Sequence, residues 1–220
     1  MAQRFLICGL LAGPLFIAVA LVQAVTRDGY DLGRHPISLL SLGEGGWVQV
    51  ANFIVAGGLC LACAVGLRRS LRSGPGHEWG PRLIGLMGAG LVLAGVFVTS
   101  AGAGFPPGAP AGAPEFSWND GLHTLGFVLA TIGAVAGGLV FARRFAAARQ
   151  WGWFTATTGA AAAIVVLVGW PDTDGISVRL LVAAAVTFAT VALAAASALV
   201  TCGAWSLPKR PASSPVRPGS

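Results

Sequence analysis

Six long apolar stretches determine what this chain can fold into. They cover residues 5–26, 47–67, 82–101, 122–142, 152–170 and 178–202. Each reaches about 18 residues or more, the length at which an α-helix crosses a bilayer. Charged residues, Pro or Gly cluster in every gap between them, which keeps the stretches separate. The sequence therefore predicts an all-α, polytopic transmembrane bundle of six helices, with a disordered cytoplasmic tail over residues 208–220.

The composition excludes the other classes of protein. Charged residues make up 10% of the chain, whereas an ordinary soluble domain carries about 25%. The 55% hydrophobic content rules out a disordered chain, which needs low hydrophobicity. Four cysteines in 220 residues are too few for a disulfide framework. The net charge of +6 lies mostly in loops on one side, so we expect no nucleic-acid partner.

The basic residues predict the orientation, because Lys and Arg accumulate in cytoplasmic loops. If the N-terminus is cytoplasmic, eleven of the fourteen basic residues fall on that side: Arg4, Arg68, Arg69, Arg72, Arg82, Arg143, Arg144, Arg149, Lys209, Arg210 and Arg217. Both termini are then cytoplasmic. Arg far outnumbers Lys, and Ala and Gly are abundant, as expected from a GC-rich bacterial genome. We therefore expect a multi-pass protein of the bacterial cytoplasmic membrane, with membrane lipids as its first partners.

Glycine is frequent inside the spans and favours close helix packing. Gly9 and Gly13 in the first span, and Gly133 and Gly137 in the fourth, have the GxxxG spacing. Small residues at this spacing allow two helix backbones to approach each other. The pattern predicts either packing within one chain or a homodimer through these faces.

Polar residues gather at the predicted outer ends of the spans, next to two long loops over residues 27–46 and 102–121. Long structured loops often carry function. Gln49 and Asn52 stand three residues apart and share a helix face. The candidate catalytic residues are His123, His35, Asp120 and Asn52. The candidate binding residues are Gln49, Asn52, Ser100, Trp118 and Trp47.

Three interpretations of the two histidines remain open. His35 and His123, with nearby carboxylates, could hold a zinc ion that activates water. One of them could instead act as a general base towards a bound lipid. In the structural interpretation, His123 caps a helix start and His35 precedes Pro36 in a turn. No local metal motif is present, so we predict no cofactor and no metal, with zinc at His35 and His123 as the alternative.

The middle of every span lacks ionisable residues, which argues against a proton-coupled transporter. The leading hypothesis is an integral membrane protein that binds a lipid or a partner through a polar pocket on its extracytoplasmic side. The alternative is an intramembrane enzyme that uses His123 and His35, either a lipid hydrolase or a prenyl-chain cyclase or transferase. A passive transporter is the third hypothesis.

Several short motifs stand in a characteristic order along the chain: HPIS from His35, GW at Gly46, GFPPG from Gly104, and SW at Ser117 with His123 beyond it. In this combination the chain resembles the bacterial six-span membrane proteins grouped as domain of unknown function family 998, over residues 9–202. Family members often carry an Asp shortly before GFPPG and a His directly after SW, where this chain has Ser100 and Asn119. The resemblance implies six helices and no established activity.

Overall fold

The computed structural model describes residues 2–112, 115–170 and 175–201. The tail predicted over residues 208–220 lies outside the described residues, as does the last residue of the sixth predicted span.

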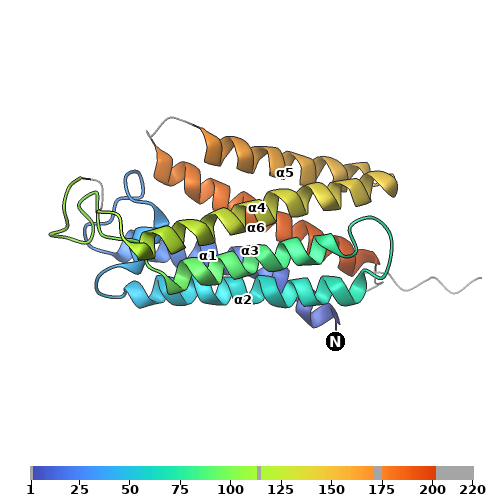
Figure 1. Ribbon diagram of the computed structural model, residues 1–220, viewed down its shortest axis with the longest axis horizontal. Helices are drawn as coiled ribbons and strands as arrows, with labels where there is room; N and C mark the ends of the chain where they lie inside the picture. Colours follow the sequence, from blue (N-terminus) through green and yellow to red (C-terminus); the bar gives the residue numbers. More distant parts are fainter. Residues whose placement is uncertain (1, 113–114, 171–174, 202–220) are drawn as a thin grey trace, which may run out of the picture.

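Six helices, each long and apolar enough to cross a membrane, form the described chain (Figure 1). They are α1 (Ala2–Thr26), α2 (Gly46–Ser70), α3 (Trp79–Val96), α4 (Trp118–Ala147), α5 (Trp151–Gly169) and α6 (Ile176–Thr201), with a short 3-10 helix, η1 (Ile37–Ser41), before α2. The predicted all-α fold with six spans is confirmed.

The helices run alternately up and down, and each packs against the next one in sequence. α6 closes the bundle against α1. It also contacts α4 and α2, so it packs against three helices besides its sequence neighbour α5. α1, α3 and α5 end at one end of the bundle, at the left of Figure 1, where α2, α4 and α6 begin. We call this the cap end, because η1 and residues 97–112 lie there, and we call the opposite end the basic end.

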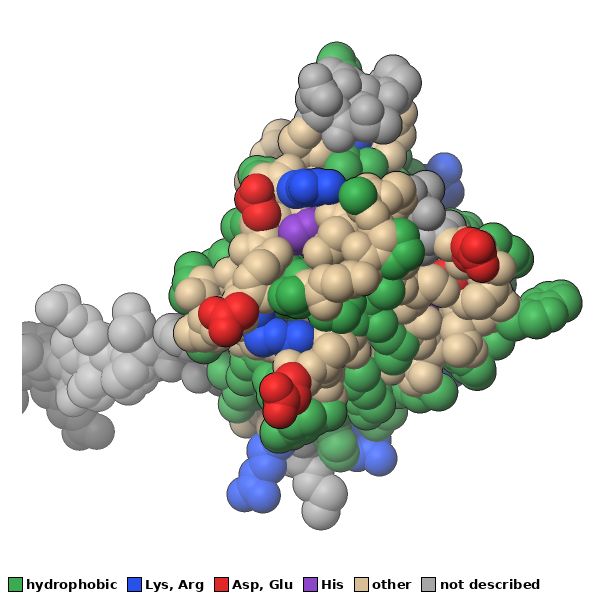
Figure 2. Space-filling view, turned by 90° about the vertical axis from the view of Figure 1, so that its left-hand side faces the viewer, with side chains coloured by type: hydrophobic (Ala, Val, Ile, Leu, Met, Phe, Trp, Pro, Cys, Tyr) green, Lys and Arg blue, Asp and Glu red, His purple; other side chains and the backbone are tan. Residues whose placement is uncertain are grey.

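The basic end is defined by its arginines, which the antiparallel arrangement brings together. They are Arg4, Arg68, Arg69, Arg72, Arg82, Arg143, Arg144 and Arg149. The cap end instead carries both acidic and basic side chains, with a histidine visible among them (Figure 2).

Several helix ends differ from the sequence prediction: at the basic end α4 continues to Ala147 instead of residue 142, and at the cap end two differences have a visible cause. α3 ends at Val96 rather than near residue 101, because Phe97 is already extended, with φ −102° and ψ 103°. α4 begins at Trp118 rather than at residue 122, because Ser117 and Asp120 form a reciprocal capping box. Such a box satisfies two backbone N–H groups that the first helical turn leaves free. The polar residues before the apolar stretch thus belong to the helix.

Glycines allow α3 and α4 to pack backbone against backbone. A Cβ atom on Gly90 would lie 2.5 Å from the Gly126 carbonyl oxygen, and one on Gly126 would lie 2.6 Å from the Gly90 oxygen. Any larger residue would push the helices apart. The GxxxG glycines of α1 also face neighbours in the same chain, since a Cβ on Gly9 would lie 2.5 Å from Cys63 Sγ.

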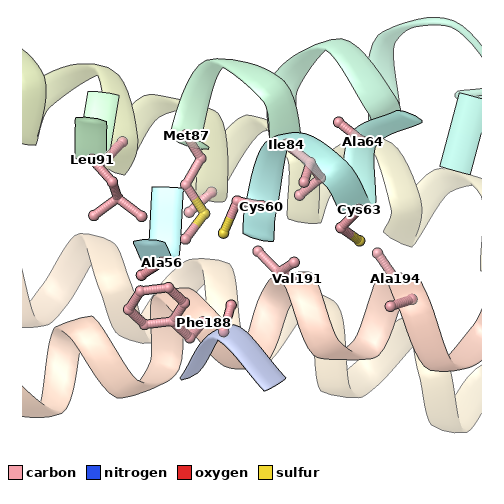
Figure 3. Packing of buried hydrophobic residues seen from close by; sticks show 14 of the residues in the cluster. Ala56, Cys60, Cys63, Ala64, Ile84, Met87, Leu91, Phe188, Val191 and Ala194 are labelled. Atoms are coloured by element: carbon pink, nitrogen blue, oxygen red, sulfur yellow. The ribbon is translucent and has the colours of Figure 1, made fainter. Parts of the chain in front are cut away.

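The centre of the bundle is an apolar core shared by α2, α3 and α6 (Figure 3). Cys60 and Cys63 are both fully buried there, beside Met87 of α3 and Val191 of α6. Free cysteine in such surroundings packs as a small hydrophobic residue.

Candidate functional site

The cap is organised around His35, which is 4% exposed. Its Nδ1 lies 2.9 Å from the Asp31 backbone nitrogen, and its Nε2 lies 3.1 Å from the Ala103 carbonyl oxygen. A backbone N–H can only donate and a carbonyl oxygen can only accept, so Nδ1 is the acceptor and Nε2 carries the proton. Nδ1 therefore stabilises a turn within the first long loop, and Nε2 joins that loop to the second one.

An aromatic cluster surrounds this histidine. The Tyr30 and Phe105 rings meet edge to face at 5.3 Å, and each lies 5.5 Å from the His35 ring. The Tyr30 hydroxyl donates to the His35 carbonyl oxygen at 2.6 Å. Burial raises the pKa of Tyr30, and the Asp31 carboxylate raises it further. The hydroxyl therefore stays protonated and keeps donating at physiological pH.

Arg27 ties η1 to the second loop. Its guanidinium donates to the carbonyl oxygens of Leu40 and Leu42, and it also lies over the Phe105 ring at 5.6 Å. A cation over an aromatic face adds an electrostatic attraction to the hydrogen bonds.

Asp120 forms the second polar centre of the cap end. Its carboxylate accepts hydrogen bonds from the backbone N–H groups of Ser100 and Ser117, at 2.6 and 2.9 Å, and from both serine hydroxyls. The Thr99 hydroxyl also donates to it, at 3.0 Å. The carboxylate thus fixes the segment after α3 to the start of α4. These hydrogen bonds occupy the oxygen lone pairs of the carboxylate, so we assign it a structural role.

A cluster of three buried amides lies between α1 and α2, one turn below the cap. Gln23 and Asn52 both donate to Gln49 Oε1, at 2.8 and 3.2 Å, and Asn52 also donates to the Phe16 carbonyl oxygen at 3.0 Å. The three side chains are 0 to 6% exposed. Gln23 Oε1, Gln49 Nε2 and Asn52 Oδ1 are buried without a hydrogen-bond partner among the described residues. Such groups are costly inside a protein, so they are unusual features of a bundle built for stability alone.

His123, on the second turn of α4, stabilises the end of the neighbouring α3. Its Nδ1 lies 2.9 Å from the carbonyl oxygens of both Ala94 and Phe97. Both are acceptors, so Nδ1 carries the proton and Nε2 is left with a lone pair. The Phe53 ring meets the imidazole edge to face at 6.1 Å. The structural interpretation expected His123 to cap a helix start; it caps the last carbonyls of another helix instead.

A cavity of about 270 Å³ lies beside His123, in the half of the bundle nearer the cap. Its walls come from α1, α2, α3, α4, α5 and α6, and η1 closes it towards the cap. The lining side chains are mainly apolar, and they include Phe16, Phe53, Ala183 and Phe188. Ser38, Thr124, Thr131 and Thr187 also line it, and the lining residues that the structure describes include no acidic residue, Lys or Arg.

The predicted site residues fall into separate groups. Gln49 and Asn52 are in the amide cluster, Ser100 bonds Asp120, and His35 is held in the cap. Trp47 and Trp118 are 73% and 88% exposed and take no part in these contacts. Among the predicted residues, His123 lines the cavity. The cavity is thus mainly apolar, whereas the sequence suggested a polar pocket.

Neither histidine bonds to a carboxylate within the described part of the chain, so no described acid orients either ring as a general base. Within the same residues, no group of three or more His, Cys, Asp or Glu side chains has the proximity that a metal ion needs. A zinc site at His35 also conflicts with its hydrogen bonds, since both ring nitrogens already face backbone groups.

Sequence reasoning missed the residues that build the cavity. Phe16, Ala183 and Phe188 look like any lipid-facing residue of an apolar span, and nothing in their spacing marks them. Sequence reasoning also does not pair Arg27 with Phe105, although Phe105 belongs to the GFPPG motif. An Arg at the end of an apolar span, with an aromatic residue in the next long loop, is the signal that could have found that pair.

The comparisons with known proteins place the chain in a family but give it no activity. No curated protein and no solved structure matches it. The family described as protein of unknown function DUF998 matches residues 10–205, which is most of the chain. The protein, a bundle of six helices able to span a membrane, therefore belongs to the DUF998 family.

Proposed function

We propose that this protein is a lipid-binding protein of the bacterial cytoplasmic membrane, with the cavity beside His123 as its binding site. The observation that carries the proposal is the cavity itself, an apolar space of about 270 Å³ within the membrane-spanning part of the bundle. Ligand sites of about 300–1,000 Å³ with mainly apolar walls and a few polar groups are typical of small-molecule binding. This cavity lies just below that range, so it fits one chain of a lipid better than a whole lipid.

Access from the membrane supports a lipid as the ligand. Two lining residues of α4, Thr124 and Phe127, are exposed on the outside of the bundle. At this level of the helix the surrounding medium is lipid, because the bundle surface is apolar. A chain can therefore enter sideways from the bilayer without crossing the cap.

The charges support an orientation with the cap outside. Eight described arginines lie at the basic end, whereas Arg27, Arg34 and Arg179 lie at the cap end. Basic residues accumulate on the cytoplasmic side of bacterial membrane proteins. The cavity then belongs to the outer leaflet.

The experiment is native mass spectrometry of the protein released from lipid nanodiscs, with one cavity-filling variant and one matched control. Ala183 is buried in the cavity wall of α6, and Ala185 is exposed on the same helix two residues later. We expect a retained lipid mass on the wild type, its loss in Ala183→Phe, and its retention in Ala185→Phe. Equal lipid retention by all three proteins would show that the adduct sits elsewhere and would contradict the proposal.

A further inference from the structure

We infer that the cavity selects a lipid whose polar end is a hydroxyl group, a long-chain alcohol, through a hydrogen bond from that hydroxyl to His123 Nε2. The inference rests on the proposed function, because it names the class of ligand for the same cavity. It follows from the hydrogen bonds of one imidazole ring and from the lining residues, among which the described part of the chain places no acidic residue, Lys or Arg.

The backbone at the end of α3 determines which ring nitrogen of His123 donates. The carbonyl oxygens of Ala94 and Phe97, each 2.9 Å from Nδ1, can only accept. They hold the proton on Nδ1, and in a neutral imidazole the other nitrogen is then an acceptor. No described residue donates to Nε2, which is the other ring nitrogen of His123, and the His123 side chain lines the cavity. The ring is therefore prepared to receive a hydrogen bond from a donor.

The other polar groups of the wall do not discriminate in this way. Ser38, Thr124 and Thr187 carry hydroxyls, which both donate and accept. The Thr131 hydroxyl donates to the Phe127 carbonyl oxygen at 2.9 Å, within its own helix. Selection between a ligand that donates and one that only accepts therefore falls to His123.

The lining also decides against a charged ligand group. A carboxylate or phosphate in an apolar cavity needs a cationic partner to offset its desolvation. No Lys or Arg is among the described residues that line the cavity, and Arg27 at the cap is already bonded to Leu40 and Leu42. An ester or ether oxygen offers Nε2 no proton. A hydroxyl is uncharged and supplies the donor, so it satisfies both conditions.

The test compares ligands that share one chain and differ at one end. Cetyl alcohol, cetyl methyl ether and palmitic acid are titrated into the delipidated protein in detergent, and the bound fraction is read by native mass spectrometry. We expect the alcohol to bind about fivefold more tightly than the ether, which is the effect of one neutral hydrogen bond. Palmitic acid, ionised at neutral pH, should bind more weakly than either.

Two variants locate the preference. His123→Asn places an amide N–H near the position of Nδ1, so it keeps a donor for Ala94 and Phe97 while removing the acceptor at Nε2. Thr131→Val is the matched control, because it removes a hydroxyl from the same wall without touching His123. We expect the ratio of alcohol affinity to ether affinity to fall to about one in His123→Asn and to stay at the wild-type value in Thr131→Val.

The outcomes separate this inference from the proposal beneath it. If the wild type binds alcohol and ether equally, or prefers palmitic acid, the hydroxyl selection is wrong while the cavity remains a lipid site. If none of the three ligands binds, and Ala183→Phe retains as much lipid as the wild type, the proposed function fails and the inference fails with it. The comparison of ligands on the wild type decides the matter even if His123→Asn does not fold.

Discussion

Arg27 at the cap end and Arg144 at the basic end make the same kind of contact in different surroundings. Each guanidinium donates to two carbonyl oxygens of a connection between helices. Arg27 donates to Leu40 and Leu42, between α1 and α2, and Arg144 donates to Ser73 and Pro75, between α2 and α3. The Arg27 bonds are partly buried and lie beside the Phe105 ring. The Arg144 bonds are exposed. The cap end is thus built as a small packed structure, whereas the basic end is a set of solvated turns.

The acidic residues Glu78 and Asp120 show the same difference between the two ends. At the basic end, Glu78 lies 3.4 Å from Arg82 and 3.9 Å from Arg68, and all three side chains are about half exposed. At the cap end, Asp120 pairs with no arginine among the described residues, but it accepts five hydrogen bonds from three neighbouring residues. Exposed ion pairs contribute little to stability, whereas multiple short hydrogen bonds to a carboxylate contribute more. The two ends should therefore respond very differently to substitution.

The largest expected effect is at the centre of the cap. Phe105→Ala removes a ring that is 1% exposed and contacts Tyr30, His35 and Arg27. We expect it to lower the free energy of unfolding by about 3 kcal/mol, as for other buried Phe to Ala changes. Equilibrium unfolding in mixed micelles measures it. Phe116→Ala is the control, since that ring is 81% exposed, and it should change stability by less than about 0.5 kcal/mol.

Asp120→Ala comes next, because it removes the acceptor for five donors between α3 and α4. We expect a loss of about 2 kcal/mol, since the site is partly open to solvent and water replaces some of the bonds. The same unfolding titration measures it. A loss under about 0.5 kcal/mol would mean that the carboxylate is free for another role.

Substituting Arg27 and Arg144 compares the two ends most directly. Arg27→Ala should cost about 1.5 kcal/mol, because it leaves two partly buried carbonyl oxygens unpaired and removes a cation from the Phe105 ring. Arg144→Ala should cost about 0.5 kcal/mol, because water can replace its bonds. Equal losses in the two variants would refute the difference between the ends.

Glu78→Ala has the smallest expected effect. Its pairs with Arg68 and Arg82 are exposed and long, so we expect a change below about 0.5 kcal/mol at low salt and less at high salt. Thermal unfolding at two ionic strengths measures it. A salt-sensitive loss above about 1 kcal/mol would place a cooperative charge network at the basic end.

The fold was largely predictable, because bilayer thickness dictates the length of every apolar stretch. The number of helices follows from the length of the apolar stretches, and the shared face of Gln49 and Asn52 follows from helical periodicity. The ends at the cap were not predictable in the same way. α3 stops at Val96 because a residue 27 positions later caps it, and hydropathy is insensitive to such a contact.

The candidate site was less predictable than the fold. His35 and His123 stand out in the sequence, but their hydrogen bonds go to backbone atoms, which leave no pattern in the residue types. The cavity is walled by Phe, Ala and Leu, the residues that also face lipid. A sequence cannot distinguish an apolar side chain beside a cavity from one beside an acyl chain, because both surroundings favour the same residues.

The position of the cavity behind exposed Thr124 and Phe127 also determines how its occupancy has to be measured. A ligand that enters sideways is first dissolved in the bilayer, where apolar molecules are strongly concentrated relative to water. Occupancy then follows the mole fraction of the ligand in the membrane and is insensitive to its nominal concentration in the buffer. Two preparations with the same total ligand but different amounts of lipid should therefore differ in occupancy, and the dissociation constant is meaningful when expressed per lipid.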